Sequence, residues 1–187
     1  NVDIHQVLIC LENTGIYGRC LVTFLQSEQA FVWVVNPVEI KRSIGLVRGK
    51  NDQVDAERIC LYAFRHQDKA QAYIQPEKSL EKVAALLSTR ESLLKAKELL
   101  LTPIKEKEAV GLQEEAALMR EVCQENILCL NKGIKQIEKK LEELIKQERK
   151  LEDNYKLVRS VKGIGMITAL YLLVYTGNFT KFSNAKK

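Results

Sequence analysis

Apolar residues spaced alternately three and four apart over residues 127–144 constrain the fold of this chain more than any other feature. They are Ile127, Leu130, Ile134, Ile137, Leu141 and Leu144. Such spacing places them along one face of a long helix, as in a coiled coil. A shorter stripe lies upstream, at Leu80, Val83, Leu87 and Leu94, in a helix that Thr102-Pro103 is expected to interrupt. The two stripes predict a helical segment over 76–158, as either an antiparallel hairpin within one chain or a coiled coil between chains.

Residues 1–75 alternate between strand-like and helix-like patterns. The runs Val7–Leu11 and Phe31–Val35 are continuously apolar, as expected of parallel strands buried on both faces. Helical spacing lies between them, and a further helix is predicted from about Asp52 to Arg65. This order predicts a β-α-β unit. Because two strands rarely form a stable sheet alone, we expect further strands and interpret the chain as a fragment cut at both ends.

Three acidic residues stand at positions suited to metal binding. Glu12 follows the first strand-like run, and Asp52 and Asp55 lie three apart at a helix start, so their carboxylates share one face. Ligands of α/β folds gather at the carboxyl edge of parallel strands, so we expect all three near one sheet edge. Carboxylates bind Mg²⁺, with Mn²⁺ as a substitute, and such sites serve phosphodiester chemistry. The competing interpretation is that Asp52 and Asp55 only cap the helix.

Two further segments contain candidate phosphate contacts. One is a basic stretch, expected to be a loop, beside the acidic residues. The other is a glycine-containing turn between two apolar helical segments, a pattern typical of a helix-hairpin-helix, in which the backbone and a helix N-terminus can approach a phosphate. The candidate residues are Lys41, Arg42, Arg48 and Lys50 in the first segment, and Lys162, Gly163 and Gly165 in the second. A solvated loop and an ordinary helix–helix turn are the competing interpretations.

Composition narrows the classes of function. The net charge of +5 over 187 residues is compatible with nucleic-acid binding without requiring it. The five cysteines form no Cys-x-x-Cys pair and the two histidines lack ligand spacing. We therefore expect reduced core cysteines, a cytoplasmic location and no zinc site. No apolar run is long enough to span a membrane, and neither a Walker loop nor a nucleophile-elbow serine is present.

Four segments resemble, in order, the DEDD transposases of the IS110 insertion-sequence family, which includes Piv-type DNA invertases. They are Leu-Glu-Asn-Thr-Gly-Ile-Tyr-Gly (11–18), Val-Asn-Pro (35–37), Lys-Asn-Asp-Gln-Val-Asp-Ala (50–56) and Val-Lys-Gly-Ile-Gly (161–165). The resemblance implies an α/β plus α fold in three parts. These are a partial RuvC-like (RNase H fold) domain over 1–75, a coiled-coil segment over 76–158 and the start of a transposase domain over 159–187.

The same resemblance implies a magnesium-dependent enzyme. Glu12, Asp52 and Asp55 match the second, third and fourth acidic residues of the family, which bind magnesium. The family's first aspartate and its proposed nucleophilic serine match no residue here and are expected outside this chain. We therefore expect the full-length protein to be a DNA recombinase that cleaves and exchanges strands, and this fragment to be inactive.

The expected partners follow from that activity. By resemblance they are DNA and a guide (bridge) RNA, in the cytoplasm of a bacterium or archaeon and in association with the nucleoid. Because recombination holds two duplexes at once, we expect a homo-oligomer joined through the coiled coil, with no membrane contact.

Two other functions remain open at this point. A non-enzymatic coiled-coil scaffold with a small α/β head predicts that Asp52 and Asp55 are only caps. A Holliday-junction-resolvase or RNase-H-like nuclease predicts cleavage through the acidic site alone, without the C-terminal domain.

Overall fold

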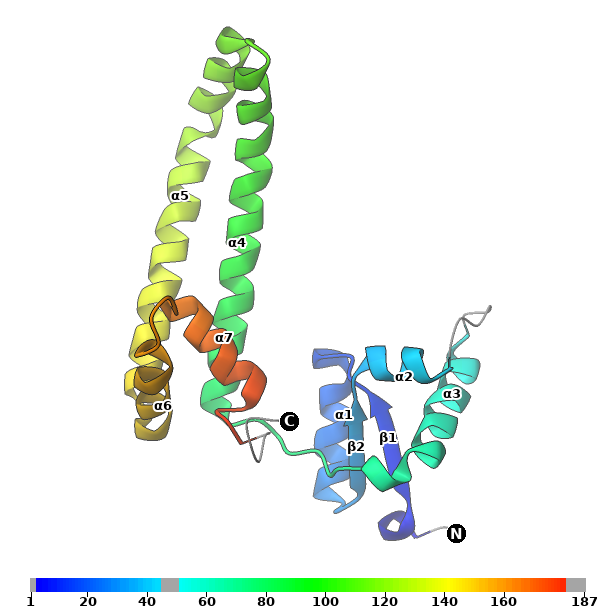
Figure 1. Cartoon of the computed structure of the whole chain (residues 1–187). Coiled ribbons are helices and arrows are strands. Elements are labelled where there is room, and N and C mark those ends of the chain that lie inside the picture. The colour runs from blue at the N-terminus through cyan, green and yellow to red at the C-terminus, as the bar shows by residue number, and fades with distance from the viewer. Residues whose placement is uncertain (1–2, 45–50, 181–187) are drawn as a thin grey trace. The chain divides into compact units, whose positions relative to one another are not determined.

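The computed structural model describes residues 3–44 and 51–180. The chain divides into two compact units, Asn1–Gln75 and Pro76–Lys187. It is mostly helical, with one small parallel sheet in the first unit and long helices in the second (Figure 1). Among the described residues, no helix combines the length and the apolar character needed to cross a membrane.

The first unit is built around two parallel strands, as the sequence predicted. β1 (Leu8–Glu12) pairs in parallel with β2 (Phe31–Val35), and Glu12 lies opposite Val35. The helices of the unit are α1 (Ile16–Ser27), α2 (Pro37–Ile44) and α3 (Asp52–Arg65), with short 3-10 helices at Ile4–Gln6 and Gln67–Lys69.

Helices pack on both faces of this sheet, which explains why its strands are continuously apolar. On one face, Val22 and Leu25 of α1 form a core with Val32 of β2. On the other face, Trp33 of β2 packs in a second core with Tyr62 of α3. Alternate strand residues point to opposite faces, so each strand contributes to both cores.

Residues 37–44 form a helix, so the prediction that the basic stretch from Lys41 to Lys50 is a loop was wrong for residues 41–44. Pro37 occupies the first helical position, where its missing N–H costs nothing. The Asn36 side chain accepts the N–H of Val38 at 3.0 Å and so caps the helix. Lys41 and Arg42 lie on α2 and are exposed. Arg48 and Lys50 lie outside the described residues.

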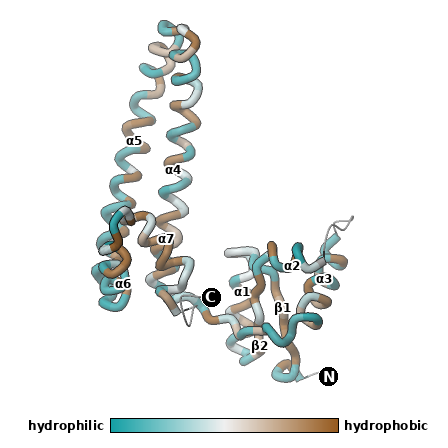
Figure 2. The backbone as a smooth tube through the Cα atoms, in the orientation of Figure 1, coloured by the Kyte–Doolittle hydropathy of each residue, from teal (hydrophilic) through white to brown (hydrophobic). Residues whose placement is uncertain are grey.

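The second unit contains a long helical hairpin within one chain. Its helices are α4 (Lys78–Ala109), α5 (Gln113–Lys146), α6 (Arg149–Arg159) and α7 (Met166–Thr176). The predicted stripes meet between α4 and α5, where Leu87 and Leu141 are buried in one core, and Figure 2 shows hydrophobic positions recurring along both helices. Arg90 of α4 also forms an ion pair with Glu138 of α5 at 2.8 Å. Of the two arrangements left open by the sequence, the structure shows the hairpin.

Pro103 does not end the first of these helices, so the predicted interruption was wrong. A proline inside a helix removes one hydrogen bond and costs about 3 kcal/mol. The next residue, Ile104, is completely buried, and burying a residue of this size recovers roughly 1.5–3 kcal/mol. α4 therefore continues to Ala109.

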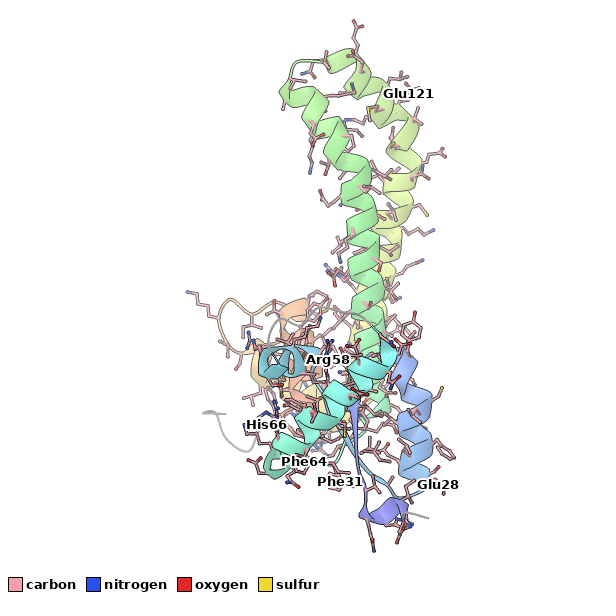
Figure 3. All side chains as sticks on the ribbon, turned by 90° about the vertical axis from the view of Figure 1, so that its right-hand side faces the viewer. Glu28, Phe31, Arg58, Phe64, His66 and Glu121 are labelled. Carbon is pink, nitrogen blue, oxygen red and sulfur yellow. The ribbon has the colours of Figure 1, made fainter. Side chains whose placement is uncertain are left out.

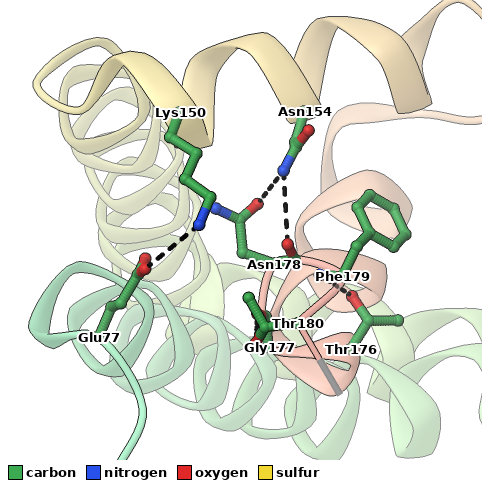
Figure 4. A network of polar contacts seen from close by, with 8 residues as sticks. All are labelled: Glu77, Lys150, Asn154, Thr176, Gly177, Asn178, Phe179 and Thr180. Atoms are coloured by element: carbon green, nitrogen blue, oxygen red, sulfur yellow. Dashed lines mark hydrogen bonds and ion pairs between the residues drawn. The ribbon is translucent and has the colours of Figure 1, made fainter. Parts of the chain in front are cut away.

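The last described helices complete the core of the second unit. Leu151 of α6 and Leu170 of α7 are fully buried with Leu141 of the hairpin. The end of α7 is held by the contacts in Figure 4, where the Asn154 amide donates to Asn178 Oδ1 at 2.8 Å. Asn178 is 2% exposed and, at φ +57, adopts a left-handed conformation that asparagine tolerates better than most residues.

The cysteines only partly match the expectation that they are core residues. All five are free, as expected of reduced thiols, but Cys20, Cys60 and Cys129 are exposed. These three lie on α1, α3 and α5.

Candidate metal site and nucleic-acid contacts

Glu12 ends β1 at the carboxyl edge of the sheet. Cys10, two residues earlier, packs against the core to which α3 contributes, so strand alternation places Glu12 on the same side as α3. The Asn13 N–H donates to the Val35 carbonyl at 2.8 Å, which continues the strand pairing past Glu12. Gly15, at φ +67, then lets the chain turn into α1. The backbone is thus regularly structured both before and after Glu12, and this fixes the position of Glu12 at the edge of the sheet.

Asn51, rather than either aspartate, caps α3. Its side-chain oxygen accepts the N–H of Gln53 at 3.0 Å, and its backbone is extended as in other capping residues. Asp52, the first helical residue, is exposed, and its carboxylate makes no hydrogen bond or ion pair with any described residue. Its charge suits the helix dipole, but the cap does not need it. The capping interpretation therefore leaves Asp52 without a specific contact.

Asp55 has a partner that the sequence interpretation missed. Its Oδ1 atom accepts a hydrogen bond from Arg58 at 2.8 Å, with the Arg58 side chain 19% exposed and that of Asp55 43% exposed. Arg58 is labelled on α3 in Figure 3. The spacing of three along a helix was the available signal for this pair. Arg58 therefore restrains the Asp55 carboxylate through Oδ1.

The three predicted ligands do not by themselves form a complete metal site. Within residues 3–44 and 51–180, no group of three or more His, Cys, Asp or Glu side chains could hold an ion. Glu12, Asp52 and Asp55 supply the oxygen donors that magnesium prefers, but they do not converge as a set. The described residues are therefore insufficient for the predicted ion, and no reaction step follows from this geometry.

The space between β1 and α3 is apolar rather than ligand-like. A cavity of about 420 Å³ lies there, lined mostly by aliphatic residues together with Cys10 and Cys60. Burial, with a smaller contribution from Cys60, raises the pKa of the Cys10 thiol to about 11. Cys10 is therefore protonated at neutral pH, so this cavity does not offer a thiolate from Cys10 to a cation.

A hydrogen bond holds α2 against α3, and an aromatic contact holds α3 against β2. The Tyr62 hydroxyl donates to Glu39 of α2 at 3.3 Å, and its ring lies 5.5 Å from Trp33 and 4.7 Å from His66 between centroids. Burial raises the pKa of Tyr62, and the Glu39 carboxylate raises it further. The hydrogen bond to Glu39 thus attaches α2, the helix that carries Lys41, to α3.

The turn between α6 and α7 leads into a helix N-terminus that has no side-chain cap. Gly163 has φ +94, and Gly165 precedes α7 without a side-chain cap. The N–H groups of the first turn of α7 therefore lack side-chain partners, and such groups bind anions. Arg159 donates to the Ile164 carbonyl at 2.6 Å and holds the turn, while Lys162 is exposed.

Replacing Gly163 by alanine is expected to cost about 1–2 kcal/mol, because a left-handed backbone is unfavourable for an L side chain. No atom lies within 4 Å of the added Cβ, so the cost comes from the backbone alone. Gly165→Ala is the matched control, because its φ is −79 and its surroundings are also open. Thermal unfolding would measure both, and equal losses would contradict the assigned conformation.

Comparison with known proteins agrees with the family resemblance. A family model described as a transposase of the DEDD, IS110 type matches residues 2–104, which is more than half of the chain. The pilin gene-inverting proteins of Moraxella bovis and Moraxella lacunata are each 28% identical over 182 residues, which is 95% of this chain and 53% of each relative. The chain thus spans about half the length of these relatives. It belongs to the IS110 family of DEDD transposases.

Proposed function

We propose that the full-length protein is a DNA recombinase that cleaves and exchanges strands in a magnesium-dependent reaction. The observation that carries this proposal is Asp52, which lies inside the matched region and stays exposed beside a separate capping residue. The names of the two relatives describe inversion of a pilin gene, and inverting a DNA segment requires strands to be cut and rejoined.

Glu12, Asp52 and Asp55 are proposed as this chain's share of a divalent-metal site, for Mg²⁺ or Mn²⁺. At least one further ligand must come from residues other than those described, because the described carboxylates do not form a three-ligand group. Arg58 is proposed to orient Asp55 through its 2.8 Å contact. In this assignment residues 1–75 are the metal-binding, RuvC-like part, and the three-part domain division stays a proposal.

Two surfaces are proposed to hold phosphates without reading sequence. One comprises Lys41 and Arg42 on α2, together with Arg48 and Lys50. The other is the turn containing Lys162, Gly163 and Gly165, as the start of a transposase domain over 159–187. DNA and a guide RNA are the proposed partners, in the cytoplasm and near the nucleoid. Protomers are proposed to associate through the helical segment over 76–158.

The test is strand cleavage and exchange by the full-length protein on DNA that carries the element ends. Reactions would contain magnesium, manganese or a chelator, with and without RNA transcribed from the element's flanks. We expect exchange only with metal and RNA. Folded protein that acts on DNA under none of these conditions would instead support the scaffold function. Cleavage by a protein ending at residue 158 would support the nuclease.

A further inference from the structure

α5 carries a second periodic stripe on the side away from α4. We define this outer stripe as the ten positions reached from Glu114 by alternating steps of four and three, ending at Lys146. At 100° per residue these positions lie opposite the buried seam that contains Ile134 and Leu141. All ten are exposed. The stripe therefore runs the length of the helix without a covering element among the described residues.

The charges of the outer stripe are segregated by sign. Its first half contains Glu114, Glu121 and Glu125 and no cation. Its second half contains four lysines and one glutamate; the lysines are Lys132, Lys135, Lys139 and Lys146. Within the described part of the chain, none of these seven side chains forms an ion pair. Glu121 is labelled near the loop end of α5 in Figure 3.

Between the first and last turns of α5, where the helix dipole has little effect, this segregation places like charges beside one another. Like charges three or four apart destabilise a helix, whereas opposite charges at these spacings stabilise it. Elsewhere on the hairpin, exposed residues follow the favourable pattern, as in Glu91–Lys95 and Lys140–Glu143, both at 2.9 Å. Lys140 lowers the pKa of Glu143, and Lys139 and Lys146 lower it further. The second half of the stripe is thus electropositive, because its four lysines outnumber its single glutamate, Glu142.

We propose that the outer stripes of two copies of this chain pair antiparallel about a two-fold axis at residue 130. Such an axis places each residue opposite the one that lies equally far on the other side of residue 130. Three opposite-charge pairs result, and symmetry repeats each of them: Glu114 with Lys146, Glu121 with Lys139, and Glu125 with Lys135. Leu128 lies opposite Lys132, whose methylene stem can cover it. Leu118 lies opposite Glu142, and this pair makes no favourable contribution to the association.

A second copy of the chain offers an opposite charge to both halves of the stripe. A nucleic-acid backbone would attract the lysine half but be repelled by the glutamate half. This proposal rests on the association of protomers proposed above and identifies the surface through which the protomers associate. Exposed ion pairs contribute little affinity and mainly select orientation. The pairing is therefore weak alone and weakens as salt rises from about 0.05 M to about 0.5 M.

Charge reversal tests the pairing. The association of the full-length protein would be measured by analytical ultracentrifugation, alone and as equimolar mixtures. Lys135→Glu/Lys139→Glu and Glu121→Lys/Glu125→Lys are each expected to weaken self-association about tenfold or more. Mixing these two variants restores every pair in the heterodimer and is expected to restore association. The variant with all four changes also restores the pairs. Lys78→Glu/Lys82→Glu, the same charge change on α4, is the matched control and is expected to have no effect.

Three results would overturn the proposal. One is a protein that stays monomeric at low salt. Another is association that survives in both double variants. The same conclusion follows if neither the mixture nor the variant with all four changes restores association, although circular dichroism shows that these proteins have normal helix content. The last is a lysine reversal that weakens DNA binding and leaves association unchanged, which would make the lysine half a phosphate surface. Metal-dependent strand exchange by a protein whose stripes do not pair would refute this inference and leave the proposed function intact.

Discussion

Replacing Asp52 by asparagine is expected to lower metal-dependent strand cleavage by about 1,000-fold, as loss of a charged group from a catalytic centre does. Stability is expected to fall by less than about 1 kcal/mol, because only the interaction with the helix dipole is lost. Asn51 still accepts the Gln53 N–H and keeps the helix capped. Cleavage by the full-length protein and thermal unfolding of the same preparation measure the two effects.

The neighbouring residue provides the matched control. Asn51→Ala removes the cap and is expected to cost about 0.5–2 kcal/mol of stability, since alanine offers no side-chain acceptor. Cleavage by the folded fraction is expected to persist. The reverse outcome, with an active Asp52→Asn protein that is the less stable of the two, would assign capping to Asp52 and remove it from the metal site.

Replacing Leu141 by alanine is expected to destabilise the second unit by about 2–5 kcal/mol, because a buried cavity remains where the side chain was. Leu141 is fully buried in the core shared by α4, α5, α6 and α7. Urea unfolding followed by circular dichroism measures this loss, because most of the helical residues of the chain belong to the second unit. Trp33, the only tryptophan, reports on the first unit by its fluorescence.

Leu99→Ala is the control for this substitution. Leu99 lies on the same hairpin but is 76% exposed, so its loss is expected to change stability by less than about 0.5 kcal/mol. Equal effects of the two substitutions would contradict the packing described for the hairpin. A shift of the Trp33 transition in the Leu141→Ala protein would show that the two units unfold together.

Periodic and strongly punctuated segments were predictable from the sequence. The strand at Phe31–Val35 and the helix at Asp52–Arg65 have the bounds that the sequence predicted. Asn36-Pro37 ends the continuous apolar run of the strand, and Asp52 and Asp55 stand where the helical pattern begins. β1 begins one residue later than predicted and includes Glu12. The family resemblance was confirmed by a match over residues 2–104, a range that contains all three of these segments.

Tertiary packing decided the segments that were predicted wrongly. The helix at Pro37–Ile44 carries consecutive basic residues, and the local pattern favoured a loop. Ile40 and the contact between Glu39 and Tyr62 attach it to the core. Pro103 likewise argues locally for a helix end, but its buried neighbour Ile104 keeps the helix intact. Neither long-range contact is visible in a short sequence window.

The candidate site was predictable in residue type and only partly in geometry. Parallel pairing and strand alternation place Glu12 on the α3 side of the sheet, as the order of elements implied. The sequence did not identify Arg58 as the partner of Asp55, nor Asn51 as the cap. It also could not show whether the carboxylates converge, because that depends on side-chain positions. Their role as metal ligands stays a prediction.

The proline in α4 has a mechanical consequence for the hairpin. Because Pro103 has no N–H, the carbonyl four residues earlier, at Leu99, lacks its helical partner. Bending at this point breaks no hydrogen bond there, whereas bending nearer the shared core would strain an intact ladder. We therefore expect the loop end of the hairpin to bend more easily than the part nearer the shared core.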